Sequence, residues 1–172
     1  PGSTFEDYKR EYQQVIFPTI ELMEICAQRN IKFVYFSSGG TVYGNRADMK
    51  PFAETDPMAP ISFYGWSKQM MENSIHYVQR TTGLQYLILR PSNPYGHGQN
   101  IHARQGLIAV ALGKIFAGEP ITVWGDGSNV RDYIYIDDLC EAVVLLLEKD
   151  VHNTTINIGS GEGISINDII NV

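Results

Sequence analysis

The sequence FSSGGTVYG, residues 36–44, ends the strand on which the predicted fold depends. The apolar run before it, residues 31–36, is rich in aromatic and β-branched side chains, which predicts a buried strand over residues 32–38. From Ser37 to Gly44 the chain then places two serines, a threonine, a tyrosine and three glycines. Three interpretations fit this composition: a phosphate-binding loop, a strand end that carries catalytic side chains, or a polar turn.

Predicted helices and strands alternate on both sides of this stretch. Apolar side chains recur at helical spacing over residues 4–30, where Pro18 predicts a kink or a restart, and over residues 62–82, where Gly83 is a natural end. Further helices are expected at residues 102–117, 137–149 and from 164 onward, a loop at 45–62, and strands at 84–89, 120–125, 130–136 and 154–160. This alternation predicts an α/β fold with a parallel sheet.

Composition limits the classes of function. The chain has 172 residues, 44% of them hydrophobic, which suits one globular domain or part of one. A net charge of -6 with scattered Lys and Arg argues against a nucleic-acid partner. No apolar run reaches the ~18 residues that cross a membrane, so we expect no membrane partner. Cys26 and Cys140 lie in helix-like patterns, which favours a reducing cytoplasm, and the four histidines share no ligand spacing, so we expect no metal site.

The segment YGWSK, residues 64–68, carries the first chemical signal. Tyr64 and Lys68 are four residues apart and so lie on one face of the predicted helix. A lysine ammonium beside a tyrosine stabilises its phenolate, which turns a group with a reference pKa of ~10 into a usable acid or base. By itself the spacing also fits two unrelated surface side chains.

Five segments together resemble one protein family. FSSGGTVYG, YGWSK, LRPSNPYG (residues 89–96), WGDGSNVRDYIYIDD (124–138) and INIGSGEGISINDII (156–170) occur in this order. In order and spacing the chain resembles the extended short-chain dehydrogenase/reductase family, in its NAD-dependent epimerase/dehydratase branch, and within it the enzymes similar to UDP-glucose 4-epimerase. This resemblance implies a Rossmann-like fold that binds NAD.

The resemblance also implies roles for individual residues around the reaction. Tyr64 is expected to be the catalytic acid/base, and Lys68 is expected to bind the nicotinamide ribose and to hold Tyr64 toward its phenolate. Ser38 and Thr41 are expected as strand-end hydroxyls that face the substrate. The expected cofactor contacts are Ser37, Ser38, Tyr64, Lys68, Pro91 and Ser92.

For the substrate, the resemblance implies an amide contact from Asn93 and a grip of Arg131 on the nucleotide diphosphate, which suits a planar cation with paired donors. The side chains expected around the nucleotide base and ribose are Leu107, Val123 and Trp124. For Val123 and Trp124 the alternative is core packing. For Arg131 the alternative is an ion pair with Asp126 or Asp132.

The implied activity is 4-epimerisation of a UDP-hexose, in which tightly bound NAD takes a hydride from C4 and returns it to the opposite face. Related dehydratases carry an acidic residue shortly after the strand hydroxyl, whereas this chain has Gly40 and Thr41 there, so elimination is disfavoured. The alternatives are a 4,6-dehydratase or reductase of the same family, and a non-catalytic module that binds nucleotide sugars or dimerises.

The sequence departs from the family pattern in several places. It lacks the motif G-x-x-G-x-x-G that receives the pyrophosphate, and GSGEG (residues 159–163) is interpreted as a turn. We therefore expect a fragment, the C-terminal half of the doubly wound fold, with strands near residues 33, 87 and 157 as strands 4-5-6 and residues 94–153 as a largely substrate-binding region. The isolated chain is expected to bind NAD weakly or not at all and to be inactive.

Two further expectations concern the strand end and assembly. The position 25 residues before Tyr64, where the family usually has Ser or Thr, is Gly39, so the required hydroxyl is expected from Ser38, Thr41 or a water at Gly39. In this family the first long helix and the Tyr-Lys helix pair across a two-fold axis. We therefore expect a homodimer through the helices at residues 5–30 and 62–82.

Overall fold

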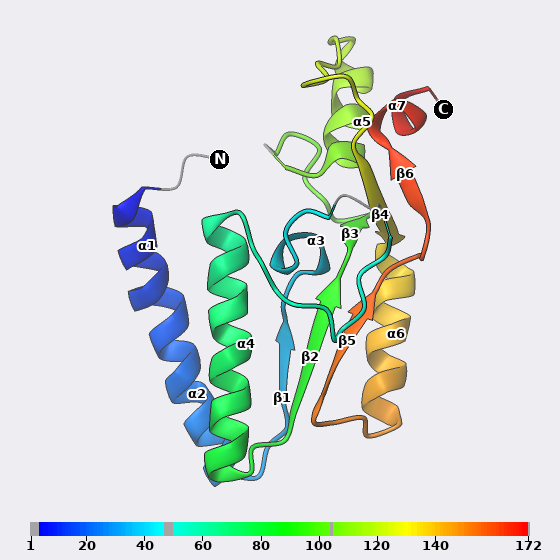
Figure 1. Ribbon diagram of the computed structural model, residues 1–172. Helices are drawn as coiled ribbons and strands as arrows, with labels where there is room; N and C mark the ends of the chain where they lie inside the picture. Colours follow the sequence, from blue (N-terminus) through cyan, green and yellow to red (C-terminus); the bar gives the residue numbers. More distant parts are fainter. Residues whose placement is uncertain (1–3, 47–49, 104, 172) are drawn as a thin grey trace. The chain divides into compact units, whose positions relative to one another are not determined.

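A computed structural model describes residues 4–46, 50–103 and 105–171 (Figure 1). The chain divides into two compact units, one of Pro1–Arg90 with Glu148–Asn157, and one of Pro91–Leu147 with Ile158–Val172. The expected substrate-binding region at residues 94–153 stays a prediction. In the part of the chain that the structure describes, no helix is both long enough and apolar enough to span a membrane.

A three-stranded sheet forms the centre of the first unit. Its strands are β1 (Phe33–Phe36), β2 (Tyr86–Pro91) and β5 (Thr154–Ile158), in the order β1-β2-β5. Strand β1 runs parallel to β2, with Phe33 opposite Tyr86 and Phe36 opposite Leu89. β2 is buried along its whole length, as the apolar run Tyr86–Leu89 predicts for a central parallel strand. The predicted order of the strands near residues 33, 87 and 157 is therefore confirmed.

The first long helix is continuous, and its middle is a π-helix. It consists of α1 (Phe5–Glu11), η1 (Tyr12–Ile16) and α2 (Phe17–Gln28). Pro18 has no N–H to donate, and its ring crowds the preceding turn of an α-helix. The π-turn lies directly before Pro18, where the N–H of Phe17 donates to the carbonyl of Tyr12. A π-turn accommodates such a conflict without breaking the helix, so the expected kink or restart is replaced by a change of helical period.

Helix α4 (Phe63–Thr82) carries both residues of the predicted catalytic pair. Gly83 ends it in the left-handed conformation with φ 77°, as the sequence predicts. Ser62, the expected first residue, is its N-cap and accepts from the N–H of Gly65. In Figure 1, α4 lies between the first long helix and the sheet. These elements share one hydrophobic core: Ile16, Met23, Cys26, Phe33, Met71, Ile75, Val78, Leu84, Tyr86 and Ile88.

The stretch after β1 forms an additional short helix, α3 (Gly39–Val42), which the sequence does not predict. Ser38 starts it with extended backbone. The expected loop at residues 45–62 contains no helix or strand in its described residues, 45–46 and 50–62. α3 therefore turns the chain from the end of the strand into this loop.

The second unit contains a mixed sheet of β3 (Asn93–Tyr95), β4 (Val130–Tyr135) and β6 (Gly163–Ser165), in this order. β3 is parallel and β6 antiparallel to β4. Its helices are α5 (Leu107–Ala117), α6 (Ile136–Glu148) and α7 (Ile166–Ile170).

Two expectations for this unit are wrong. Residues 120–125 form no strand, because Pro120 has no N–H to donate and no strand in the described chain pairs with this segment. Helix α5 begins at Leu107 rather than at residue 102, after Gly106 with φ 96°. A left-handed residue cannot continue a helix, so residues before it are excluded from α5.

A fully buried ion pair joins α4 to β2. The carboxylate of Glu72 is 0% exposed and accepts from Arg90 Nε at 3.0 Å and from Nη2 at 2.5 Å. Ser37, at the end of β1, donates its hydroxyl to the same carboxylate. The pair thus connects the helix to the ends of two strands.

The other side of the guanidinium extends this network. Arg90 Nη1 donates to the Tyr43 hydroxyl at 2.5 Å and to the carbonyl of Glu54 at 3.3 Å. Tyr43 in turn donates to the side chain of Asn157 on β5 at 2.7 Å. A buried charge is stable only when its hydrogen bonds are satisfied, and this network satisfies both ions.

We expect Arg90→Leu to destabilise the chain by about 3–5 kcal/mol, because it leaves the Glu72 carboxylate buried without its cation. Urea unfolding of the 172-residue chain measures this. The double variant Glu72→Met/Arg90→Leu should recover part of the loss, since no buried charge remains. Lys9→Ala, which breaks the exposed pair with Glu6, is the control and should cost at most about 1 kcal/mol. An equal cost for Arg90→Leu and Lys9→Ala would contradict the prediction.

Candidate active site

Tyr64 and Lys68 lie in the first two turns of α4, beside the end of β1. The Lys68 ammonium donates to the carbonyl of Phe36, the last residue of β1, at 2.9 Å. It lies 5.5 Å from the centre of the Tyr64 ring and 4.9 Å from the centre of the Tyr35 ring. The helix therefore brings the predicted pair together at a strand end.

Burial shifts the pKa values of this pair in opposite directions. It raises the pKa of Tyr64, and the negative charge of Glu11 raises it further. Burial lowers the pKa of Lys68, which Glu11 and Glu72 partly offset. Neither shift favours the charged form of its group, and the role of Lys68 in holding Tyr64 toward its phenolate stays a prediction.

The strand-end hydroxyls have different surroundings. The Ser37 hydroxyl donates to the carboxylate of Glu72, and Ser37 is only 4% exposed. Ser38 occupies the N-cap of α3 but makes no capping hydrogen bond with its side chain. Thr41 has a buried hydroxyl oxygen with no hydrogen-bond partner among the described residues. Gly39 offers no side chain, so Ser38, Thr41 and a water at Gly39 all remain candidates.

Gly65 permits a close approach of α3 to the first turn of α4. A Cβ atom at Gly65 would lie 2.6 Å from the carbonyl oxygen of Thr41 and 2.9 Å from Pro60. Backbone contact at this distance excludes any larger residue without a shift of one helix. The residue that follows Tyr64 therefore determines how closely the strand-end segment lies to it.

The predicted residues of the second unit begin at the end of β2. Pro91 is buried, and Ser92 donates its N–H to Ile158 at 2.8 Å while its buried hydroxyl has no partner in the described part of the chain. The Asn93 side chain donates to the carbonyl of Asp132 at 2.7 Å. The amide nitrogen of Asn93 thus ties β3 to β4.

Arg131 is exposed and is held by local contacts. Its Nη1 donates to Asn129 Oδ1 at 3.1 Å and to the carbonyl of Val130 at 2.9 Å. The Asp126 carboxylate accepts from Ser128, which lowers the pKa of Asp126. Asp132 accepts from the N–H groups of residues 160 and 161 at 2.9 and 2.8 Å. The alternative of an ion pair between Arg131 and either aspartate is therefore contradicted within the described residues.

The residues expected around a nucleotide base differ in exposure. Trp124 is 89% exposed, which contradicts the alternative of core packing for this side chain. Val123 and Leu107, the first residue of α5, are partly buried. A large aromatic side chain in this degree of exposure leaves its faces open to a planar ligand.

Several residues that organise the site were not predicted. Glu72 and Arg90 join α4 to the strands, and Tyr35 lies beside the Lys68 ammonium. Asn167 holds the loop before Arg131. The Asn167 side chain donates to the carbonyl of Asp126 at 2.9 Å, and its N–H donates to Gly127 at 3.1 Å. One signal was present in the sequence, because Glu72 lies four residues after Lys68 and so on the same helical face.

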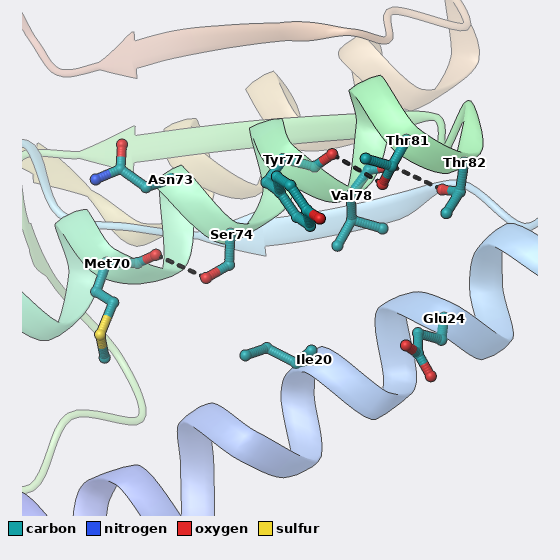
Figure 2. Close-up of a pocket in the computed structure, with 9 residues that line it drawn as sticks. All are labelled: Ile20, Glu24, Met70, Asn73, Ser74, Tyr77, Val78, Thr81 and Thr82. Carbon is teal, nitrogen blue, oxygen red and sulfur yellow. Dashed lines mark hydrogen bonds between the residues drawn. The ribbon is translucent and has the colours of Figure 1, made fainter.

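A groove of about 600 Å³ lies elsewhere on the first unit, between α2 and α4 (Figure 2). In Figure 2, Ile20 and Glu24 project from α2 toward the side chains of α4. The lining residues are Ile20, Glu24, Met70, Asn73, Ser74, Tyr77, Val78, Thr81 and Thr82. Neither Tyr64 nor Lys68 lines this groove, so we assign it no part in the chemistry.

Lys68 and Tyr64 can both make contacts beyond those within the described chain. An ammonium has three N–H donors, and the described residues accept only one hydrogen bond from Lys68, at Phe36. Tyr64 is 52% exposed, so its phenol is accessible. The sequence has no G-x-x-G-x-x-G motif, which is the segment that would receive the pyrophosphate of the cofactor.

Comparison with known proteins identifies similar enzymes. The chain is 43% identical to the dTDP-4-dehydro-6-deoxyglucose reductase of Escherichia coli, over 85% of this chain and 48% of the reductase. The structure is similar to UDP-glucose 4-epimerase of Thermotoga maritima, solved with UDP-glucose, at TM-score 0.82 and 36% identity over 87% of this chain and 48% of the epimerase. It is also similar to UDP-glucose 4-epimerase of Thermus thermophilus, solved with NAD, at TM-score 0.79 and 32% identity over 87% of this chain and 50% of that one.

The chain thus spans about half the length of these relatives. Its residues 2–159 match the NAD dependent epimerase/dehydratase family. The parallel α/β sheet and the tyrosine and lysine at its edge agree with this match. The chain therefore belongs to the NAD dependent epimerase/dehydratase family, whose cofactor is NAD.

Proposed function

We propose that the whole protein is a nucleotide-sugar 4-epimerase that acts on a UDP-hexose. The observation that carries this proposal is the position of Lys68, which is bonded to the last residue of β1 and lies over the Tyr64 ring. The epimerase from Thermotoga maritima, solved with UDP-glucose, supports the class of substrate.

In the proposed mechanism Tyr64 removes the proton from the sugar 4-hydroxyl and later returns it. NAD, when bound, supplies the chemistry of hydride transfer at C4. The pKa of Tyr64 must fall for this step, and Lys68 is the cation that α4 places beside its ring. Thr41 or Ser38 relays the proton, and Thr41 is the stronger candidate because its buried hydroxyl lacks a partner among the residues described.

Substrate binding is assigned to the second unit. Arg131, with an exposed planar guanidinium, pairs with the diphosphate, and Trp124 stacks on the base. The contacts from Asn93, Leu107 and Val123 to the substrate, and from Ser37, Pro91 and Ser92 to the cofactor, belong to the same proposal. Gly40 and Thr41 offer no carboxylate after the strand, which argues against elimination of water by a 4,6-dehydratase.

A second candidate is reduction of a 4-keto sugar. It is favoured by the 43% identity to a dTDP-4-dehydro-6-deoxyglucose reductase. Both reactions use the same tyrosine and lysine, but they differ in whether the cofactor is consumed. An epimerase regenerates NAD in every turnover, whereas a reductase consumes one reduced cofactor for each product.

We also propose a homodimer through the first long helix and α4. Helix α2 carries apolar side chains both toward the core and toward solvent, with Met23 and Cys26 buried and Phe17, Leu22 and Ile25 exposed. Large apolar side chains that gather on the surface of a helix mark a candidate protein–protein contact. In this proposal a second copy packs on the exposed apolar side chains of α2 and on the groove between α2 and α4 in Figure 2. The free thiols of Cys26 and Cys140 support the proposal that the protein is cytoplasmic.

Tyr64→Phe in the whole protein should lower kcat about 10²–10⁴-fold, because the acid/base is lost while the ring remains. Conversion of UDP-glucose to UDP-galactose measures this. Tyr77→Phe, on the same helix and 62% exposed, is the matched control and should retain activity. An unchanged rate for Tyr64→Phe would contradict the role of Tyr64, whereas no conversion by the unaltered whole protein would support the non-catalytic module.

The balance of the cofactor separates the two reactions. With UDP-glucose and NAD, the whole protein should form UDP-galactose without accumulation of NADH, since each hydride returns to the sugar. Absorbance at 340 nm and chromatography of the sugars measure this. Stoichiometric consumption of reduced cofactor with a dTDP-4-keto-6-deoxy sugar, and no epimer from UDP-glucose, would replace the epimerase by the reductase.

Sedimentation of the whole protein should show a dimer, which Leu22→Asp weakens because it places a charge in the apolar contact. Leu22 is 49% exposed. We expect the dissociation constant to rise at least about tenfold, since each desolvated charge costs more than 1.4 kcal/mol. The control is Leu145→Asp on α6, also 49% exposed but outside the proposed interface. A wild-type monomer at high concentration would disprove the dimer.

A further inference from the structure

We propose that Tyr35 is a positioning residue, which holds the Lys68 ammonium at the end of β1 through the face of its ring. The ring centre lies 4.9 Å from Lys68 Nζ, within the range of a cation–π interaction. The contact itself does not depend on the reaction. Its consequence for cofactor binding rests on the proposed function.

The position of Tyr35 in the sheet explains why its ring is well placed. Side chains alternate along a strand, so Phe33 and Tyr35 lie on the same face of β1, toward the core shared with α4. The two rings are stacked, with centres 6.5 Å apart and planes 12° from parallel. Phe33 is buried in the core and lies too far along the strand to face the ammonium, so it serves below as a packing control on the same face.

Three groups surround the Lys68 ammonium. The carbonyl of Phe36 accepts its hydrogen bond at 2.9 Å, and the rings of Tyr35 and Tyr64 lie 4.9 and 5.5 Å away. A lysine side chain has a flexible four-carbon stem, which these contacts restrict to one arrangement. A restricted side chain loses less freedom when it binds a ligand, so Tyr35 prepares Lys68 for the ribose hydroxyls.

The chemistry of the ring suits this role. Burial raises the pKa of Tyr35 well above its ordinary value, so the ring stays neutral wherever Lys68 is charged. An aliphatic side chain would fill the space but would offer no π face to the cation. Phenylalanine would keep the face and lose only the hydroxyl, which makes Tyr35→Phe the matched control for Tyr35→Leu.

Nuclear magnetic resonance of the 172-residue chain with ¹³Cε-labelled lysine tests the contact directly. The chain has six lysines, and Lys68→Met identifies the Lys68 signal by its disappearance. We expect the Hε signal of Lys68 upfield of the other five, because of the ring currents. Tyr35→Leu should move it downfield, whereas Tyr35→Phe and Phe33→Leu should leave it in place.

These outcomes decide the proposal without any assay of activity. A Lys68 signal that is not shifted in the wild type would overturn it before any variant is made. It would also be overturned if Tyr35→Phe or Phe33→Leu moved the signal as far as Tyr35→Leu does, because the hydroxyl or general packing would then be responsible.

Titration of the whole protein with NAD tests the consequence. Tyr35→Leu should weaken binding about three- to tenfold, as loss of a partly buried cation–π contact predicts, and Tyr35→Phe and Phe33→Leu should not. Unchanged affinity for Tyr35→Leu would overturn the role in cofactor binding. If the protein proves not to be an epimerase, the lysine spectra still decide whether Tyr35 positions Lys68.

Discussion

The buried ion pair of Glu72 and Arg90 is the interaction on which the geometry of the candidate site depends. It joins α4 to β2, and Ser37 adds the end of β1 to the same carboxylate. Glu72 follows Lys68 by one helical turn and lies on the same face, so fixing Glu72 against the strands also fixes the rotation of α4 about its axis. Hydrophobic contacts alone would permit the helix to slide or rotate, whereas a charge that is buried with its partners has one satisfactory arrangement.

The same network holds the segments that follow the strand. The guanidinium reaches Tyr43, directly after α3, and the carbonyl of Glu54 in the loop. Tyr43 also stacks on Phe52, with ring centres 4.6 Å apart, and bonds to Asn157 on β5. These polar contacts therefore hold the strand-end segment in place. The segment meets α4 at Gly65, where only glycine leaves room for the carbonyl of Thr41. Residues outside the predicted site thus determine the position of the strand-end segment relative to Tyr64.

Local signals in the sequence predicted most of the first unit. Helix α4 was delimited by Ser62 and Gly83, because capping depends on neighbouring residues alone, and the order of the strands near residues 33, 87 and 157 followed from the family resemblance. Strands β3 and β6 were not predicted, since each has only three residues and exists through its pairing with β4. Arg90 was also missed as a structural residue, because its charge interrupts an otherwise apolar strand and its partner lies 18 residues earlier on a helix. Pairings of this kind depend on tertiary structure, which periodicity does not report.

The spacing of Tyr64 and Lys68 predicted their proximity but not the direction of their ionisation. Burial disfavours charge on both groups, so it raises the pKa of the phenol and lowers that of the ammonium. Glu11 adds a negative charge, which supports the ammonium but opposes the phenolate. A cation is needed to reverse the effect on Tyr64, and Lys68 lies beside the ring while its hydrogen bond goes to the strand carbonyl. Burial and Glu11 therefore both act against the phenolate, and in the proposed mechanism the neighbouring ammonium has to outweigh them.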